Sequence, residues 1–396
     1  MNIGIFTDTY YPEINGVANS AYQLKKELEA RGNNVYVFTV SNPKMRDYET
    51  HVFRISSIPL VLLKDRRIGC TTLGFWYKVI KNLNLDVIHT QTEFTVGHIG
   101  RKVARKLGIP LIHTYHTIYE DYTHYLRIPG NQKLRGTIRS LSRVCCDHAD
   151  IVVVPTKKVK NLLISYGVKK NIVVQPTGVD LAKFQNVEET QVERLREQYG
   201  LKHTDHVLIS IGRLSKEKSI DEIIALTEKI RQTDQRIKLV IVGNGPEEKI
   251  LKKIVIDRQL DNCVIFTGAV NWSEIQNYYA LGNVFVSAST SETQGLTYVE
   301  ALASGKPLLV KKDECLNEIL EYGKNGYSFT TDSEFISNYQ KFFEANEWTN
   351  MNASAVDAAK HISSSRFGYG IEQIYMDALK AEKEGQTYEK IHAVAG

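Results

Sequence analysis

Short hydrophobic runs rich in Val and Ile alternate along the chain with longer stretches in which apolar residues recur every three or four positions. The short runs are typical of buried strands and the longer stretches of amphipathic helices, so the pattern predicts βαβ units and a mostly parallel sheet. The first such unit is a strand at 2–6, a helix at 17–31 and a strand at 34–40. Gly32 stands where a glycine ends a helix.

Two series of strands are predicted, and the turn residues at 175–180 separate them. In the first series the strands lie at 2–6, 34–40, 52–55, 86–89, 110–114 and 151–155. In the second series they lie at 207–211, 238–242, 264–267, 284–287 and 307–310. Such a pattern is typical of an α/β fold with two Rossmann-like domains that face each other across a cleft, where open α/β sheets bind ligands.

The predicted domains are an N-terminal one at 1–178, expected to face the acceptor and the membrane, and a C-terminal one at 179–365. Residues 366–396 are predicted to be a helix and tail, for which packing back on the N-terminal domain is one arrangement. A length of 396 residues suits this division, because each half is long enough to bury its own core.

The charge differs between the halves. The whole chain has a net charge of +5, but residues 1–178 carry 25 Lys and Arg against 13 Asp and Glu, a net +12. The remainder carries 25 against 32, a net −7. A basic first half suggests an anionic partner for that half.

The cysteines and the hydrophobic runs bear on the compartment. The five cysteines are odd in number and form no C-x-x-C pair, which favours reduced thiols in a cytosolic protein. We find no apolar run long enough to span a bilayer and no basic segment ahead of the apolar residues that follow Met1. A cytoplasmic chain without a signal peptide is therefore expected.

The most informative motif is the stretch 291–303, which follows a predicted strand. Thr293-Gln-Gly-Leu296 opens a helix, whose first N–H groups lack partners and suit a phosphate. Glu292 precedes this turn, and Glu300 lies about two helical turns further on, where it can accept bonds from ribose hydroxyls. A pair of glutamates at this spacing is common by chance, but its place between a strand and a helix favours a site.

A second element is the loop that follows the strand at 207–211. Arg213 and Lys218 lie on it, and a guanidinium and an ammonium can together neutralise a diphosphate. The alternative is two solvated surface cations. Both loops follow strands of one sheet, which favours the diphosphate interpretation.

These motifs, with Asn15-Gly-Val17, resemble the retaining glycosyltransferases of family 4, which have the GT-B fold. The resemblance covers nearly the whole chain. It implies that Arg213 and Lys218 bind the diphosphate, Glu292 the donor sugar and Glu300 the ribose, and that 268–270 is the base-binding loop. It implies donor contacts from Gly16, Val17, Arg213, Lys218, Val270, Thr293, Gln294, Gly295, Leu296 and Glu300. Ser219 departs from the glycine that the family commonly has there.

On the acceptor side, the stretch 113–125 concentrates His, Tyr and acidic residues after a strand. His113 lies inside the strand and is expected to be a core residue. His116 lies just beyond it, and the resemblance places a functional His there, so the implied catalytic set is His116, Glu292, Arg213 and Lys218. His116 and the stretch His89-Thr-Gln-Thr-Glu-Phe94 look more specifically like the diacylglycerol glucosyltransferases of Gram-positive bacteria.

Two segments suit contact with a lipid surface. Residues 58–81 and 133–145 combine basic residues with apolar or aromatic ones, which is typical of segments that lie in the headgroup layer. The expected membrane contacts are Arg66, Arg67, Trp76, Lys133, Arg135, Arg139 and Arg143. An ordinary amphipathic helix that covers the core explains 133–145 equally well.

Other binding chemistries fit less well. Gly243-Asn-Gly245 follows a strand, but the third glycine of a dinucleotide fingerprint is replaced by Glu248, so a tight turn beside the donor site is expected rather than NAD. We find no Asp-x-Asp pair and no His or Cys cluster, so neither an obligatory metal nor another cofactor is indicated. Nucleic acid is not expected, because the chain has no recognisable module and its second half is acidic.

The expected function is retaining transfer of glucose from UDP-glucose to the hydroxyl of diacylglycerol, in glycolipid or lipoteichoic-acid anchor synthesis. The protein would lie in the cytoplasm, peripherally on the inner face of the cell membrane. The alternatives are a family 4 transferase for a soluble or polysaccharide acceptor and a non-catalytic protein that binds nucleotide sugars. We identify no carboxylate nucleophile, and Asp8 and Glu13 are fallback candidates for acceptor contacts.

Overall fold

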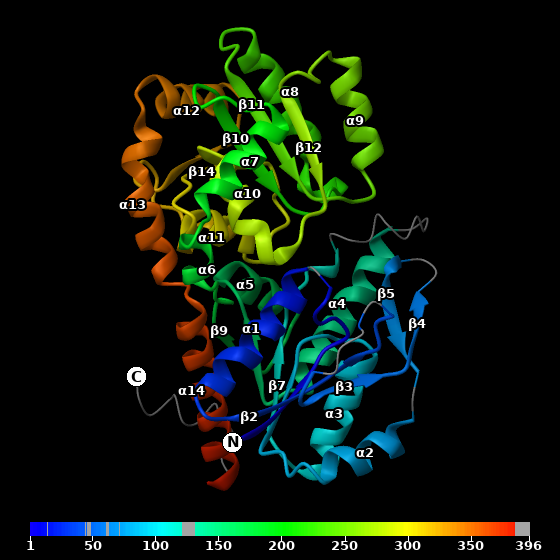
Figure 1. The fold of residues 1–396 in the computed structure, drawn as a ribbon. Coiled ribbons are helices and arrows are strands. Elements are labelled where there is room, and N and C mark those ends of the chain that lie inside the picture. The colour runs from blue at the N-terminus through cyan, green and yellow to red at the C-terminus, as the bar shows by residue number, and fades with distance from the viewer. Residues whose placement is uncertain are drawn as a thin grey trace. The chain divides into compact units, whose positions relative to one another are not determined.

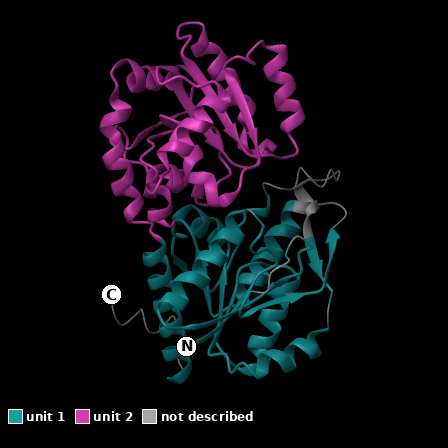
Figure 2. Ribbon diagram, viewed as in Figure 1, with its two compact units in different colours: residues 1–178, 364–396 teal, residues 179–363 magenta. Residues whose placement is uncertain are grey.

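The protein divides into two compact units, each built on a parallel sheet (Figures 1 and 2). A computed structural model describes residues 1–13, 15–43, 45, 49–60, 63–70, 72–120 and 131–384, apart from the side chains of 63–66 and 131–134. The first unit comprises residues 1–178 and 364–396, and the second comprises residues 179–363.

The first unit has a seven-stranded sheet in the order β3-β2-β1-β6-β7-β8-β9, in which every neighbouring pair is parallel. Most of its strands are runs of Val and Ile buried on both faces, as parallel sheets covered by helices require. The strands are β1 (Asn2–Phe6), β2 (Asn34–Val40), β3 (Val52–Ile55), β6 (Val87–Thr90), β7 (Leu111–Thr114), β8 (Ile151–Val154) and β9 (Asn171–Val174).

Helices cover this sheet and begin mostly where the strands end. Asn15 caps the first of them, because its side chain accepts a hydrogen bond from the Ala18 N–H at 3.0 Å. The helices are α1 (Gly16–Ala30), α2 (Leu73–Lys81), α3 (Thr95–Leu107), α4 (Asn131–Asp147), α5 (Lys157–Ser165) and α14 (Ser364–Lys383).

Helix α14 closes the first unit, although it lies at the far end of the chain. It runs beside α1 (Figure 1) and contributes Phe367, Ile371 and Tyr375 to the core beneath β1 and β2. The carboxylate of Glu372 adds two hydrogen bonds, from Asn33 at 2.7 Å and from Arg31 at 2.5 Å. The first unit is therefore complete only with the C-terminal helix.

The second unit has a six-stranded sheet in the order β12-β11-β10-β13-β14-β15, also parallel throughout. Its strands are β10 (His206–Ile211), β11 (Ile237–Val242), β12 (Val264–Gly268), β13 (Val284–Ser287), β14 (Leu308–Lys311) and β15 (Gly326–Phe329). Its α-helices are α6 (Leu181–Gln185), α7 (Glu189–Tyr199), α8 (Ile220–Arg231), α9 (Glu248–Asp257), α10 (Ile275–Leu281), α11 (Leu296–Ala303), α12 (Asp332–Glu344) and α13 (Glu347–Lys360).

The predicted strands are all present, with ends within one residue of the expected ones. The sequence pattern missed β9, β15 and the antiparallel hairpin of β4 (Ser57–Leu60) and β5 (Leu63–Gly69). The hairpin was missed because charged residues interrupt its second strand, so it does not have the alternation of a half-buried strand.

Candidate active site

The two donor motifs of the second unit start from one edge of its sheet. Strands β10 and β13 are parallel neighbours, with Leu208 opposite Val284, so the loops that follow them begin side by side at the carboxyl ends. The hydroxyls of Ser289 and Ser291 both donate to the Glu217 carbonyl oxygen, each at 3.4 Å, and so tie one loop to the other.

Lys218 and Glu292 meet across these loops. The Lys218 Nζ donates to Glu292 Oε1 at 2.5 Å. The side chain of Lys218 is 29% exposed and that of Glu292 is 13% exposed. Arg213 is exposed on the same loop as Lys218. The tertiary structure therefore brings a cation of the first motif onto the carboxylate of the second.

Gly295 makes the turn before α11. It has φ +73°, and a Cβ added there would lie 2.5 Å from the ring of Tyr298. Tyr298 is fixed in turn, because its hydroxyl donates to the Ser287 Oγ at 3.1 Å. A glycine is therefore needed at position 295 for two reasons: its positive φ and the lack of room for a Cβ. The turn of residues 293–296 leads into the N-terminus of α11, and helix N-termini favour anions.

Glu300 lies on the same helix and is buried, with 9% of its surface exposed. Its Oε2 accepts a hydrogen bond from the Tyr279 hydroxyl at 2.7 Å. Burial raises the pKa of Glu300 to about 7, while the Tyr279 hydrogen bond and the charge of Lys183 oppose this rise. Tyr279, on α10, is a functional candidate that sequence reasoning missed, because nothing in the chain pairs it with Glu300 before folding.

The base-binding candidate Val270 is half-buried and packs against the core of this unit. Close to it in the chain, Trp272 accepts a hydrogen bond from the Lys183 ammonium through its carbonyl oxygen, and the same ammonium lies over its ring. Lys183 therefore links the loop after β12 to the electrostatic surroundings of Glu300.

Gly243 and Gly245 support the loop that carries Arg213. A Cβ on Gly243 would lie 1.9 Å from the Gly212 carbonyl oxygen, and one on Gly245 would lie 2.2 Å from the Leu214 carbonyl oxygen. The Leu214 N–H donates to the Asn244 carbonyl at 2.9 Å. The two glycines thus form a tight turn packed against the loop that holds a donor candidate.

Ser219 has φ +47°, in the left-handed region that glycine adopts without strain. The departure from the family's glycine therefore places a strained serine directly after Lys218 and before α8.

In the first unit, Gly16 and Val17 form the first turn of α1 rather than an irregular loop, so the helix begins one residue earlier than predicted. Gly16 is exposed and Val17 is half-buried. Asn15, which caps the helix, also donates to the Thr9 Oγ1 at 2.8 Å and so fixes the loop after β1. Both predicted residues therefore lie at a helix N-terminus at the carboxyl edge of the first sheet.

His116 follows β7 at the same edge and is half-buried. Its Nε2 lies 2.5 Å from the Gln91 Oε1. Burial lowers the pKa of His116 to about 4, which the charge of Glu93 opposes, so the imidazole is neutral at pH 7. His113 is fully buried in β7, as its position inside the strand predicted.

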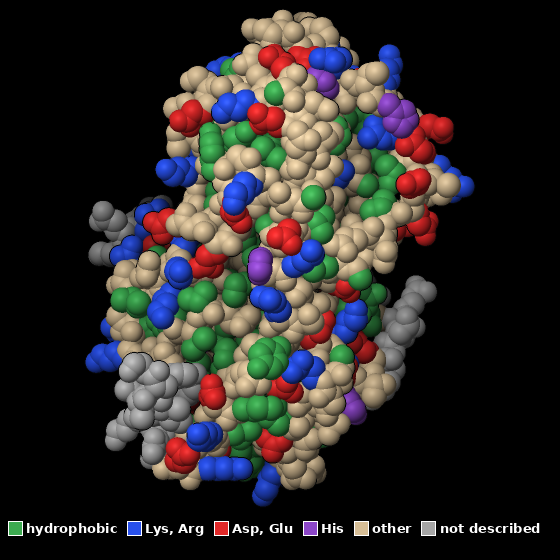
Figure 3. Space-filling model, turned by 90° about the vertical axis from the view of Figure 1, so that its left-hand side faces the viewer, with side chains coloured by type: hydrophobic (Ala, Val, Ile, Leu, Met, Phe, Trp, Pro, Cys, Tyr) green, Lys and Arg blue, Asp and Glu red, His purple; other side chains and the backbone are tan. Residues whose placement is uncertain are grey.

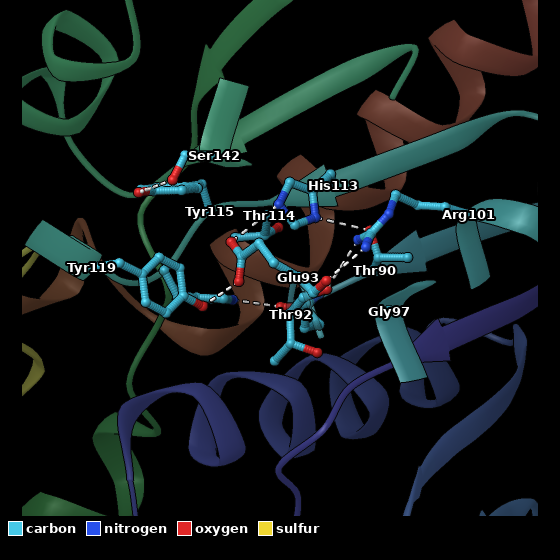
Figure 4. A network of polar contacts seen from close by, with 12 residues as sticks. Thr90, Thr92, Glu93, Gly97, Arg101, His113, Thr114, Tyr115, Tyr119 and Ser142 are labelled. Atoms are coloured by element: carbon cyan, nitrogen blue, oxygen red, sulfur yellow. Dashed lines mark hydrogen bonds and ion pairs between the residues drawn. The ribbon is translucent and has the colours of Figure 1, made fainter. Parts of the chain in front are cut away.

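A network around Glu93 occupies the adjoining part of this edge (Figure 4). Glu93 accepts a hydrogen bond from the Tyr119 hydroxyl and lies 3.4 Å from the His113 Nε2, while Arg101 donates to its carbonyl oxygen at 2.6 Å. The Tyr115 hydroxyl bonds Ser142 of α4 at 3.1 Å. The stretches 89–94 and 113–125 carried the sequence signal for these contacts, and residues 121–125 of the second stretch lie outside the described residues.

Asp8, a fallback candidate for an acceptor contact, lies at the N-terminus of α3. Its carboxylate accepts hydrogen bonds from Thr92 and Thr95, both at 2.6 Å, and from the N–H of Val96 at 2.9 Å. Asp8 thereby satisfies the N-terminus of α3, where a negative charge is stabilising. Glu13 accepts from the Thr9 hydroxyl at 2.5 Å.

The predicted membrane contacts come from the segments 58–81 and 133–145, and the structure does not support all of them. Trp76 does not fit, because only 8% of it is exposed and its ring packs edge-on against Phe38 and Phe53; the neighbouring Phe75 is 60% exposed instead. Arg67 is held by Ser57 through two hydrogen bonds of 2.7 Å. The side chains of Arg66 and Lys133 lie outside the described part of the structure.

Helix α4 exposes Arg135, Arg139 and Arg143 together with Leu141 and Val144. Arg139 bonds Glu120 and the other two arginines remain on the helix surface. On the face shown in Figure 3, basic and acidic side chains are interspersed, so the basic excess of the first unit is not gathered there. Across the described residues, no helix combines the length and apolar character needed to cross a bilayer, and no three His, Cys, Asp or Glu side chains group to hold a metal ion.

The chain is similar to known glycosyltransferases along nearly its whole length. The sequence profile of the family described as Glycosyltransferase Family 4 matches residues 14–183, and that of Glycosyl transferases group 1 matches residues 191–361. The alpha-monoglucosyldiacylglycerol synthase of Streptococcus pneumoniae is 36% identical over 382 residues, which covers 96% of this chain and 86% of that protein. The enzyme of the same name from Acholeplasma laidlawii is 33% identical, with coverage of 96% and 98%.

Solved structures share the fold. The Anabaena protein HepE in complex with UDP-glucose matches with a TM-score of 0.76 at 18% identity, covering 94% of this chain and 99% of that one. A sucrose-phosphate synthase from Thermosynechococcus elongatus matches with a TM-score of 0.75 at 19% identity, with coverage of 96% and 99%. The predicted α/β fold, with two Rossmann-like domains of the GT-B type, is thereby confirmed. The chain belongs to glycosyltransferase family 4.

Proposed function

We propose that the protein is a retaining hexosyltransferase that moves glucose from UDP-glucose to the hydroxyl of diacylglycerol, forming α-monoglucosyldiacylglycerol. The observation that carries the proposal is the donor site of the second unit, where Lys218 and Glu292, the Gly295 turn and the buried Glu300 gather at one sheet edge. The choice of glucose and diacylglycerol is supported by the two synthases of that name.

In this site the donor is held by its charges and hydroxyls. Arg213, Lys218 and the N–H groups of the 293–296 turn bind the diphosphate, and Glu300 accepts hydrogen bonds from the ribose. Glu292 binds a hydroxyl of the sugar, since a carboxylate is a strong acceptor. Fixed positive groups on the diphosphate stabilise the charge that develops as it leaves, and such preorganised stabilisation supplies much of the catalysis in enzymes of this kind.

The reaction exchanges one bond at the sugar. The bond from the anomeric carbon to the phosphate oxygen breaks, and a bond to the acceptor oxygen forms on the same face. Because the new bond forms on the face that the phosphate leaves, the carbon keeps its configuration. The acceptor's proton passes to the departing phosphate oxygen, so UDP leaves protonated. His116, neutral at pH 7, contributes a hydrogen bond to the donor sugar. No metal is required in this scheme, because Arg213 and Lys218 supply the positive charge.

The lipid acceptor is reached at an anionic membrane surface. The exposed arginines and apolar residues of α4, and the exposed Ile58 and Phe75 of the other predicted membrane segment, support such contact. The cytoplasmic leaflet carries the negative surface potential that attracts basic segments. The five cysteines are all free, which suits the reducing cytoplasm. We therefore place the protein peripherally on the inner face of the cell membrane.

The test is to incubate the protein with a panel of nucleotide sugars and with diacylglycerol in anionic vesicles, and to analyse the lipid by mass spectrometry. A product heavier than diacylglycerol by one hexose should form with UDP-glucose, and an α-glucosidase should cleave it to glucose and diacylglycerol. Transfer only to a soluble sugar or polysaccharide would show a different acceptor. Binding of UDP-glucose with no UDP release on adding lipid would show a non-catalytic binder.

A further inference from the structure

The stretch His89-Thr-Gln-Thr-Glu-Phe94 has buried polar side chains for which the proposed reaction gives no role. Residues 89–93 are all at most 8% exposed, and they comprise the end of β6 and the start of the loop that follows it at the carboxyl edge of the first sheet. Buried polar groups cost free energy unless they are hydrogen-bonded, so the partners of these side chains show what the stretch holds in place.

A chain of hydrogen bonds runs from α14 to His116 through this stretch. The Tyr375 hydroxyl lies 2.6 Å from the His89 Nδ1. The His89 Nε2 lies 3.2 Å from the Gln91 Nε2, and the Gln91 Oε1 lies 2.5 Å from the His116 Nε2. The His89 Nε2 also contacts the Thr114 hydroxyl at 2.6 Å. All five residues belong to the first unit.

The amide of Gln91 determines where the protons lie. Its carbonyl oxygen can only accept, so the His116 Nε2 must carry the proton and donate it. Its amide nitrogen can only donate, so the His89 Nε2 must be an acceptor, which places the His89 proton on Nδ1, facing the Tyr375 oxygen. Burial lowers the pKa of both imidazoles, so each ring carries a single proton near pH 7.

This arrangement leaves the Nδ1 of His116 as the accepting atom of its ring. Within the described residues, this atom has no hydrogen-bond partner, and His116 is half-buried rather than enclosed. The titratable groups that act on His116 are Glu93, whose charge favours the protonated ring, and His113, which opposes it.

We propose that Gln91 is a positioning residue, which with His89 and Tyr375 behind it holds His116 in the Nε2–H tautomer, so that Nδ1 accepts a hydrogen bond from a hydroxyl of the donor sugar. The proposal rests on the proposed function, in which His116 contacts that sugar. A neutral imidazole in the other tautomer presents N–H where the sugar hydroxyl needs an acceptor, so a fixed amide selects the productive form.

The test compares the ring nitrogen resonances of His116 and the steady-state kinetics in the full chain with Gln91→Leu and Gln91→Glu. In the unchanged protein, the resonances should show the Nε2–H tautomer. Gln91→Leu should give a mixture of tautomers and lower kcat about 10- to 100-fold, since a misplaced catalytic group costs up to about that factor, while the KM for the lipid stays unchanged. Gln91→Glu keeps an acceptor, and its charge should raise the pKa of His116 by at least one unit.

The matched control is Gln23→Leu, which removes another buried glutamine of the first unit, bonded to Glu27 at 3.3 Å. It should change neither the tautomer nor kcat. Tyr375→Phe removes only the far end of the hydrogen-bond chain and should lower kcat less than Gln91→Leu does. Tyr375→Phe also tests the chain if the Gln91 variants do not fold.

Two results separate this inference from the proposed function. If His116→Ala transfers glucose at the unchanged rate, the role of His116 in the reaction is wrong, and the tautomer measurement still decides what Gln91 does. If His116→Ala is inactive while Gln91→Leu keeps both the Nε2–H tautomer and the full kcat, the positioning role of Gln91 is wrong.

Discussion

Lys218 and Glu292 are 74 positions apart in the chain and form an ion pair, with 2.5 Å between the Nζ and Oε1. The pair joins the loops after two neighbouring strands, so a donor that binds there exchanges this contact for its own. Lys218 is expected to turn from the carboxylate to the diphosphate, and Glu292 to the sugar. The pair thus keeps both groups compensated and in place before the donor arrives.

The first prediction concerns Lys218. Lys218→Ala should lower kcat about 100-fold or more, because removing one group that stabilises a developing negative charge costs about that factor. If Lys218 served only to neutralise Glu292, adding Glu292→Gln would restore the rate. In the proposed role, the double variant stays slow. Release of UDP measures the rate, and Lys216→Ala, in the same turn, is the control and should be near wild type.

The second prediction concerns Glu300. Its pKa is raised from 4.5 to about 7 by burial, so folding favours the protonated form, and this contribution to stability is lost as the pH rises through 7. Glu300→Gln removes the titration but keeps an acceptor for Tyr279. Relative to this variant, the wild type should lose about 2 to 3 kcal/mol of unfolding free energy between pH 5 and pH 8, at 1.36 kcal/mol per pKa unit. A pH-independent difference in denaturant unfolding would contradict the raised pKa.

The third prediction concerns Ser219, which has φ +47°. Ser219→Gly should stabilise the protein by about 0.5 to 1 kcal/mol, since the left-handed conformation costs a side chain roughly 1 to 2 kcal/mol and glycine loses part of this gain to the entropy of the unfolded chain. The thermal midpoint should rise. Ser215→Gly, at φ −136° in the same loop, is the control and should not raise it.

The fourth prediction concerns the tight turn at Gly243 and Gly245. Gly245→Ala should move the backbone of Leu214, because its Cβ would lie 2.2 Å from the Leu214 carbonyl oxygen. The cost is about 1 to 3 kcal/mol of stability, as for other overpacked sites, and the KM for UDP-glucose should rise with the displacement of Arg213. Gly200→Ala is the control, since open space surrounds Gly200 and an alanine there would be strained only by the positive φ. It should lower stability without changing the KM.

The fifth prediction concerns α4. Changing Arg135, Arg139 and Arg143 together to Glu should weaken sedimentation with anionic vesicles by at least about 100-fold, because each lost cation near the surface removes roughly 1 kcal/mol. Neutral vesicles should bind the variant and the wild type alike. The control replaces Lys249, Lys252 and Lys253, three cations of one helix in the second unit, and should leave vesicle binding unchanged. Equal loss of vesicle binding in both variants would show that α4 is not a specific membrane contact.

The sequence by itself determined most of the architecture. Short apolar runs and the period of 3.6 depend only on which side chains must be buried, so eleven of the thirteen strands in the two parallel sheets, and the stretches that follow them, could be placed from the chain. Arg213, Lys218, Glu292 and Glu300 could be singled out as donor candidates because their motifs follow strands of one sheet, whose carboxyl ends share an edge.

The tertiary structure alone decided which groups meet and how deeply they are buried. The contact of Tyr279 with Glu300, the capping of α3 by Asp8, the burial of Trp76 and the chain from Tyr375 to His116 join residues far apart in the sequence. A local pattern carries no information on such pairs, because side-chain direction and exclusion of water arise only when whole elements pack. Those same factors set the pKa of Glu300 and of His116, and so the protonation states with which the protein works.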